Sequence, residues 1–263
     1  MSFSEDGYRI YPPDPRLLDW VKTARPIAQK LAEDPKLKSD WLRHGRTWFA
    51  GVNIFPNDEN GTWPAGPALD GDVIEAARAL CPFDIRWDTA QISIPYQGYP
   101  KQDPTETNTN HRFRKDRDAA HLDGLLPIGP KRRRHMEEYH AFVLGLPLND
   151  APRNAAPLVV WKGSHKIIHK WLMGKFASTP PDAWRDLDLT DSYADIRRHI
   201  FESCDRITIG ADLGGSYLVD RFTLHGVAPW PETFPGPEEG RIVAYFRPHW
   251  RGDLQAWLEP TGC

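Results

Sequence analysis

Short apolar segments separated by turn residues are the feature that most restricts the fold of this chain from Phe83 onward. Val, Ile, Leu and aromatic side chains recur in short runs, with Gly, Pro and Asp between them, as is typical of β-strands. The clearest runs lie at 139–146, 157–161, 206–210, 215–225 and 241–246. Short strands with longer insertions suit a double-sheet jelly roll, whose open end can hold a metal ion. We therefore predict a mainly β fold with added helices.

Residues 1–82 show a different pattern. Apolar residues recur at helical spacing from Leu17 to Leu31, although Pro26 should break or restart that helix. An Asp of the Asp70-Gly71-Asp72 turn can cap a second helix over 73–80. No catalytic constellation is visible in this region. We expect an N-terminal helical layer over 1–82, packed outside the sheet.

Length and composition fit one domain. With 263 residues, 40% of them hydrophobic, the chain can bury a substantial core, and no repeat or low-complexity linker divides it. The net charge of −3 gives no electrostatic footprint for nucleic acid. Three cysteines, at 81, 204 and 263, follow no metal or disulfide spacing. Because no long apolar run and no signal-peptide pattern occur, we expect a cytoplasmic protein that binds neither nucleic acid nor membrane.

Two histidines and one aspartate could form a metal centre. In an extended strand, residues two apart point to the same face, so His121 and Asp123 would direct an imidazole and a carboxylate to one point. A second imidazole from a distant strand, that of His225, would complete two nitrogens and one oxygen on one face of an octahedron. The opposite positions would stay open for a co-substrate and O2. Alone, a His-x-Asp tripeptide is a weak signal that chance can produce.

Two other histidines could compete for this role. His135 and Glu137 show the same alternation, but they follow the basic run 131–134 and precede a second Glu, which usually marks a solvated strand edge or turn. His165 ends a Gly-Ser-His turn, where a histidine more often stabilises the turn by hydrogen bonding than binds metal. We therefore favour the first set.

Three motifs occur in a recognisable order. They are Ala120-His121-Leu122-Asp123-Gly124, the segment 154–165 with its apolar strand and terminal Gly163-Ser164-His165, and the segment 215–226 around His225. Through these motifs, residues 119–247 resemble the phytanoyl-CoA dioxygenase family of Fe(II)- and 2-oxoglutarate-dependent oxygenases. Three ordered motifs are far more specific than one. Two positions depart from the family pattern: Val227 stands where relatives often place a hydroxyl, and Trp161 where they often carry Pro.

The resemblance implies a double-stranded β-helix, a cupin-like jelly roll, over 83–250, with a helical insertion near 166–204, in a single domain of 1–263. It implies that His121, Asp123 and His225 bind Fe(II). It also implies that Arg241 holds the distal carboxylate of 2-oxoglutarate, a planar bidentate pairing that Lys could not reproduce. Reaction with O2 would then release CO2 and succinate and hydroxylate an unactivated C–H bond of a small organic substrate.

Several contacts of this site stay open. Arg241 lies farther from His225 than the family's arginine commonly does, so Arg247 is a competing anchor for the keto acid. Three further side chains on neighbouring strands could hydrogen bond to 2-oxoglutarate: Gln91, Ser93 and Tyr139. The polar stretch 101–118 could form a lid over the site or an ordinary surface loop.

Two other functions would use the same residues. A cupin-like metalloenzyme would need the triad but no keto acid, and a noncatalytic jelly-roll binding module would keep the triad without turnover. The substrate itself is not predicted. The arginine-rich segments 112–117 and 131–134 could receive an anionic group of the substrate, or they could form a solvated basic rim. The sequence predicts no oligomeric state.

Overall fold

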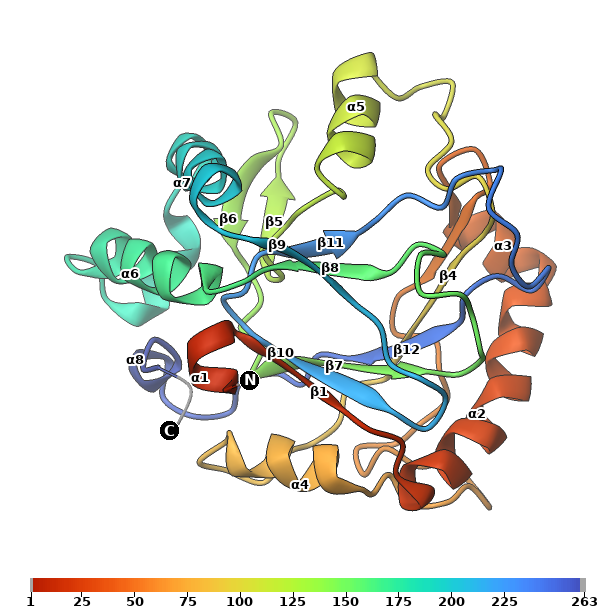
Figure 1. Cartoon of the computed structure of the whole chain (residues 1–263). Coiled ribbons are helices and arrows are strands. Elements are labelled where there is room, and N and C mark those ends of the chain that lie inside the picture. Colours follow the sequence, from red (N-terminus) through yellow and green to blue (C-terminus); the bar gives the residue numbers. More distant parts are fainter. Residues whose placement is uncertain (1, 261–263) are drawn as a thin grey trace.

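Two β-sheets face each other at the centre of the computed structural model, which describes residues 2–260 (Figure 1). The large antiparallel sheet has the strand order β1 (Tyr8–Tyr11), β10 (Ser216–Asp220), β7 (Phe142–Pro147), β12 (Val243–Phe246), β4 (Gln91–Pro95), β3 (Trp48–Gly51) and β2 (Leu42–Arg43). The small antiparallel sheet has the order β11 (His225–Val227), β8 (Leu158–Trp161) and β9 (Arg206–Ile209). A separate hairpin pairs β5 (Leu125–Ile128) with β6 (Arg133–Met136).

The chain passes back and forth between the two sheets. From β4 in the large sheet it reaches the small sheet at His121, which forms an isolated β-bridge to His225 of β11. It returns to the large sheet at β7, builds β8 and β9 of the small sheet, and then alternates through β10, β11 and β12. This antiparallel winding is a double-stranded β-helix, and it confirms the fold expected from the sequence.

Successive residues of the large sheet face two different environments, as the pleat requires. In β12, Phe246 packs in the cluster that contains Trp20 of the long N-terminal helix at residues 15–33, whereas Val243 packs with Val160 of the small sheet. Figure 1 shows α2 (Pro15–Glu33) and α4 (Asp72–Ala79) on the side of the large sheet away from the small one. One face of the large sheet is therefore covered by helices, and the other forms a wall of the space between the sheets.

The N-terminal region is only partly the helical layer that the sequence predicts. Helices α1 (Phe3–Asp6), α2, α3 (Pro35–Trp41) and α4 are present, and α2 runs through Pro26 without a break. However, β1, β2 and β3 also lie within residues 1–82 and extend the large sheet at both edges. These strands have two to four residues and pair with β10 and β4, far along the chain. Such strands are made by tertiary pairing rather than by a local pattern, so the sequence did not reveal them.

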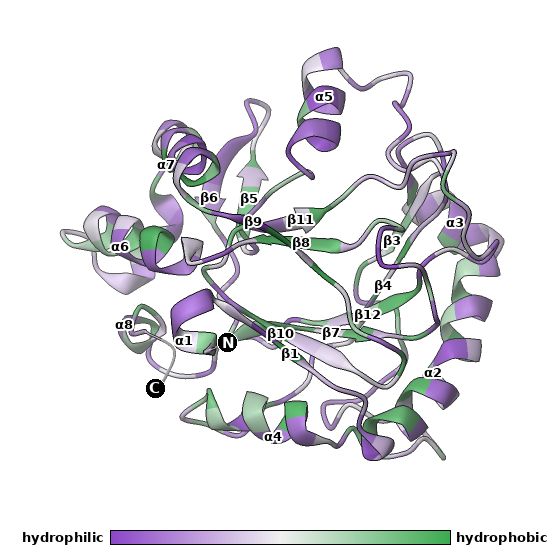
Figure 2. Ribbon diagram, viewed as in Figure 1, coloured by the Kyte–Doolittle hydropathy of each residue, from purple (hydrophilic) through white to green (hydrophobic). Residues whose placement is uncertain are grey.

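A helical insertion follows β8. It consists of α6 (Ser164–Phe176), the 3-10 helix η1 (Pro181–Asp186) and α7 (Thr190–Ser203), and α8 (Leu254–Trp257) lies near the end of the described chain. The polar stretch 101–118 contains α5 (Asn108–Asp116), which Figure 2 shows as largely hydrophilic. No helix within 2–260 is long and apolar enough to cross a membrane. Cys81 and Cys204 are free thiols, and Cys263 lies outside the described residues.

Candidate metal centre

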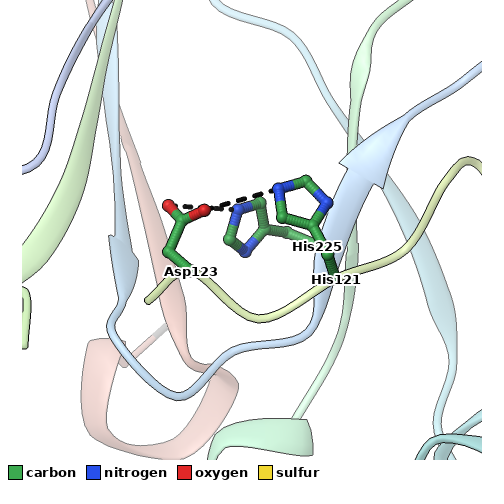
Figure 3. A group of neighbouring side chains, drawn as sticks. All are labelled: His121, Asp123 and His225. Atoms are coloured by element: carbon green, nitrogen blue, oxygen red, sulfur yellow. Dashed lines mark ion pairs between the residues drawn. The ribbon is translucent and has the colours of Figure 1, made fainter. Parts of the chain in front are cut away.

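His121 and His225 lie side by side at one end of the small sheet. The His121 amide donates to the His225 carbonyl at 2.8 Å, and the His225 amide donates to the His121 carbonyl at 3.1 Å. Reciprocal bonds of this kind put both side chains on the same face, and the ring centroids are 4.6 Å apart. Asp123 lies in the turn that follows His121, and its carboxylate joins them (Figure 3). One ligand atom from each residue lies within 4.8 Å of the others.

Two glycines let the backbone approach closely enough to form this group. At Gly124, where φ is +79°, a Cβ would lie 2.0 Å from the Glu138 carbonyl oxygen. At Gly226, a Cβ would lie 2.1 Å from the Asp118 carbonyl oxygen. The Asp118 side chain accepts two hydrogen bonds of 2.7 Å from Arg206. These contacts fix the segments on both sides of the ligand pair, and any residue larger than glycine would push them apart.

The histidine rings are held with the same nitrogen toward the centre. Nδ1 of His121 is 3.0 Å from the Ala119 carbonyl, and Nδ1 of His225 is 2.9 Å from the Thr223 carbonyl. Because a carbonyl oxygen only accepts, both Nδ1 atoms carry the proton and both Nε2 atoms are left as ligands. The Nε2 atoms lie 3.4 Å and 3.6 Å from the Asp123 oxygens. Two imidazole nitrogens and one carboxylate on one face fit an Fe(II) site with open positions.

Charge compensation keeps the carboxylate of this group ionised. Burial alone would raise the pKa of Asp123, but electrostatic interactions with His225 and Arg247 and the proximity of both imidazoles hold it well below its ordinary value. Burial would lower the pKa of His225, and the nearby Asp123 carboxylate raises it above the ordinary value instead. The ionised carboxylate therefore attracts protons or cations, as a metal ligand should.

The metal centre opens onto a cavity of about 350 Å3 between the two sheets. Six apolar residues form much of its wall: Ala50, Val52, Leu126, Val143, Leu158 and Val227. Gln91 and Ser93 also line it, in the position that the sequence suggests for contacts to a bound molecule. Tyr139 does not line it, because its ring packs against Trp257 with centroids 5.0 Å apart. Tyr139 precedes β7 instead of lying within it, so strand alternation does not direct its side chain.

The two candidate anchor arginines flank β12. By alternation they face the same way as Val243 and Tyr245, toward the space between the sheets. Arg247 lines the cavity beside the metal centre. Arg241 is buried beyond the cavity wall, at the end of β12 away from the metal centre. The structure thus brings Arg247, but not Arg241, into direct contact with the cavity.

A hydrogen-bonded pair of tyrosines lies near Arg241, and one of them, Tyr245, lines the cavity. Tyr217 and Tyr245 both lie opposite Gly145 in the sheet register, and the Tyr217 hydroxyl donates to the Tyr245 hydroxyl at 2.9 Å. A Cβ at Gly145 would lie 2.0 Å from the Tyr217 ring, so the pair depends on glycine there. Burial raises the pKa of both hydroxyls and the positive charge of Arg241 opposes that rise, which places its guanidinium nearby.

Among the polar and aromatic residues of the cavity wall, sequence reasoning did not single out Trp48, Tyr99 and Tyr245, and it named Arg114 only as part of the segment 112–117. Trp48 donates its indole N–H to the Ser93 hydroxyl at 2.9 Å. Arg114, on α5, donates to one oxygen of Glu106 through two nitrogens, at 3.2 Å and 2.9 Å. Only Arg114 had a signal, since it lies in the polar stretch that could cover the site. Trp48 and Tyr99 belong to no motif.

The competing histidines are placed away from the metal centre, as expected. The His135 ring lies at the β5–β6 hairpin and is 2.9 Å from the Arg185 carbonyl. The buried His165 ring has its Nε2 3.0 Å from the Ser4 carbonyl, so it tethers the N-terminal segment. Neither belongs to the group that could hold a metal ion.

No protein-family model matches the chain, and no curated protein matches it significantly. Among solved structures, it is similar to the non-heme α-ketoglutarate-dependent carbocyclase SnoK from nogalamycin biosynthesis, with 14% identity, a TM-score of 0.47, and 94% of this chain and 81% of that chain covered. It is similar to EctD from S. alaskensis, solved with 2-oxoglutarate and 5-hydroxyectoine, with 16% identity, a TM-score of 0.46, and 95% of this chain and 74% of that chain covered. It is also similar to AviO1 from Streptomyces viridochromogenes Tue57, with 15% identity, a TM-score of 0.45, and 93% of this chain and 91% of that chain covered. Identities and TM-scores this low assign no activity to this chain.

Proposed function

We propose that the protein is an Fe(II)- and 2-oxoglutarate-dependent dioxygenase of the phytanoyl-CoA dioxygenase type, which hydroxylates a small organic molecule. The supporting observation is the convergence of His121, Asp123 and His225 in the wall of a cavity between the two sheets of a double-stranded β-helix. Two nitrogens and one carboxylate on one face leave the remaining positions of an octahedral ion open. A cupin-like metalloenzyme could use the same triad, so the case for a keto acid depends on a further residue.

Arg241 supports 2-oxoglutarate as the co-substrate. The residue is only 5% exposed and lines a small pocket with Asn149 and Asp212, and its guanidinium has no hydrogen bond or ion pair within residues 2–260. A largely buried charge without such a partner is costly, and a carboxylate of the right reach would offset that cost. Tyr245 accepts its hydrogen bond from Tyr217, so its own proton is free to be donated to the same carboxylate. The other end of the keto acid would then reach the metal.

The residues of this chain position the reactants, while the bound metal and keto acid supply the activation of O2. The carbonyl bonds to Nδ1 of His121 and His225 orient both ligand nitrogens. Ser93 accepts the Trp48 indole N–H, which leaves its hydroxyl proton for the keto acid, and Gln91 offers an amide beside it. The apolar wall excludes water from the substrate, which limits side reactions.

Metal-dependent binding of 2-oxoglutarate tests this function. We expect the Zn(II)-loaded protein to bind one 2-oxoglutarate per chain, and the Fe(II)-loaded protein to form succinate in air. Arg241→Met should weaken 2-oxoglutarate binding by roughly tenfold to a hundredfold, the worth of a lost charged hydrogen bond, with metal affinity unchanged.

Each alternative predicts a different result. A cupin-like metalloenzyme would bind the metal but not the keto acid, and a noncatalytic module would form no succinate with any candidate substrate. Wild-type affinity for 2-oxoglutarate in Arg241→Met would exclude Arg241 as the anchor.

A further inference from the structure

Arg247 lines the cavity at the metal centre, yet its guanidinium donates no hydrogen bond to any residue within 2–260. Its Nε is buried without a partner. Its nearest charged neighbour is Asp123, with Nη1 and Oδ1 3.8 Å apart, which is beyond hydrogen-bonding distance. The side chain is 18% exposed, so water reaches only part of it. The donors of Arg247 are therefore available to a ligand in the cavity.

The backbone of Arg247 is fixed although its side chain has no partner. Its amide donates to Asp88 Oδ1 at 2.8 Å, and its carbonyl accepts from Nδ1 of His140 at 2.9 Å. The other nitrogen of that imidazole is 3.1 Å from the Glu138 carboxylate. Such an arrangement is typical of a binding group held in place before its ligand arrives.

The other charged groups around the cavity either form an ion pair or have a ligand under the proposed function. Arg114 is neutralised by Glu106. Under the proposed function, Arg241 would receive the keto acid and Asp123 would bind the metal. Asp123 would then no longer balance the charge of Arg247, because a divalent cation would take that role. One positive group would remain unmatched in a cavity whose wall is mostly apolar.

We propose that Arg247 binds the carboxylate of the prime substrate, and that this substrate is a small acid with an apolar body. The inference rests on the proposed function, since it assigns the keto acid to Arg241. The apolar body would lie against Val143, Leu158 and the Trp48 ring. Because Arg247 is adjacent to a metal ligand, the carboxylate would lie close to the metal, and the oxidised carbon would be only a few bonds from it. A cavity of about 350 Å3 is near the lower end of ligand pockets, which limits the size of this acid.

Calorimetric binding to the Zn(II)-loaded protein tests this assignment without turnover. The probes are butanoate, hexanoate and 3-phenylpropanoate, each compared with its neutral amide, with and without 2-oxoglutarate. We expect at least one carboxylate to bind roughly tenfold or more tightly than its amide. Arg247→Met should abolish that preference and change the Kd of 2-oxoglutarate by less than about threefold. Arg241→Met is the matched control: it should keep the preference for the carboxylate and weaken the binding of 2-oxoglutarate.

Three outcomes would overturn the assignment: no carboxylate preference in the wild type, a preference that survives Arg247→Met, or loss of 2-oxoglutarate binding in Arg247→Met. A second variant, Arg247→Lys, keeps the charge and should retain part of the preference, which guards against misfolding of the first. If the wild type does not bind 2-oxoglutarate but shows an Arg247-dependent preference for carboxylates, the proposed function is wrong, whereas the assignment of Arg247 as a carboxylate-binding residue is supported.

Discussion

The two faces of the large sheet differ sharply although they share the same strands. On the helix-covered face, the Phe246 ring is fully buried and lies 5.7 Å from Trp20 and 5.3 Å from Trp87, measured between ring centroids. On the opposite face, the next residue, Arg247, has no hydrogen-bond partner for its guanidinium within residues 2–260. Apolar packing on the outer face stabilises the protein, whereas burial of charged groups on the inner face opposes folding. The packed outer face can therefore offset the cost of an inner face built to bind ligands.

The largest expected effect is on the outer face. Phe246→Ala should lower the free energy of unfolding by about 3–5 kcal/mol, because it removes a buried ring from a close-packed cluster. Denaturant unfolding measures this loss. Zn(II) affinity of the fraction that remains folded should be unchanged, since Phe246 faces away from the cavity. A large change in metal affinity would mean that the two faces are not independent.

The next largest effect should be a pH dependence of stability that comes from Asp88, whose carboxyl accepts the Arg247 amide. Burial raises the pKa of Asp88 to about 6, above the value of about 3.9 for an unfolded chain. The folded state therefore binds the proton more tightly, and this carboxyl makes the protein more stable as pH falls from about 6 to about 4. Relative to Asp88→Asn, the wild type should gain about 1–3 kcal/mol over that range. If the free energies of unfolding of the wild type and Asp88→Asn differ by the same amount at every pH, this prediction is wrong.

The smallest effect should be a gain in stability from the inner face. Arg241→Met replaces a buried charge that has no hydrogen bond or ion pair within residues 2–260, so it should raise the free energy of unfolding by about 1–2 kcal/mol while impairing 2-oxoglutarate binding. Arg206→Met is the matched control, because Arg206 is paired with the buried Asp118 and its removal should destabilise the protein. If both variants lose stability alike, Arg241 has a partner in solution.

The sequence predicted the features that depend on local periodicity or ordered motifs. The strands of the β-helix follow from period-two patterns, and the grouping of His121, Asp123 and His225 follows from the motif order, although Asp123 lies in a turn and not in the extended strand expected. It could not predict β1 and β3, which exist because of distant pairing partners. It also placed Tyr139 in a strand that begins three residues later, and so could not orient its side chain.

The positions of the two arginines could not be separated from sequence either. Arg241 and Arg247 stand six residues apart at the two ends of the run 241–246, so the alternation expected from sequence predicts the same direction for both. In the structure, Arg247 lines the cavity and Arg241 does not. Likewise, Trp48 reaches the cavity through β3, a strand that no local sequence pattern predicts.

The most direct test of the central claim is a crystal structure of the protein with Fe(II) and 2-oxoglutarate, prepared without oxygen. We predict one iron bound by His121, Asp123 and His225, with the keto acid chelating it and the distal carboxylate paired with Arg241. Arg247 should still face an open part of the cavity. Iron bound elsewhere, or a distal carboxylate held by Arg247, would contradict this account.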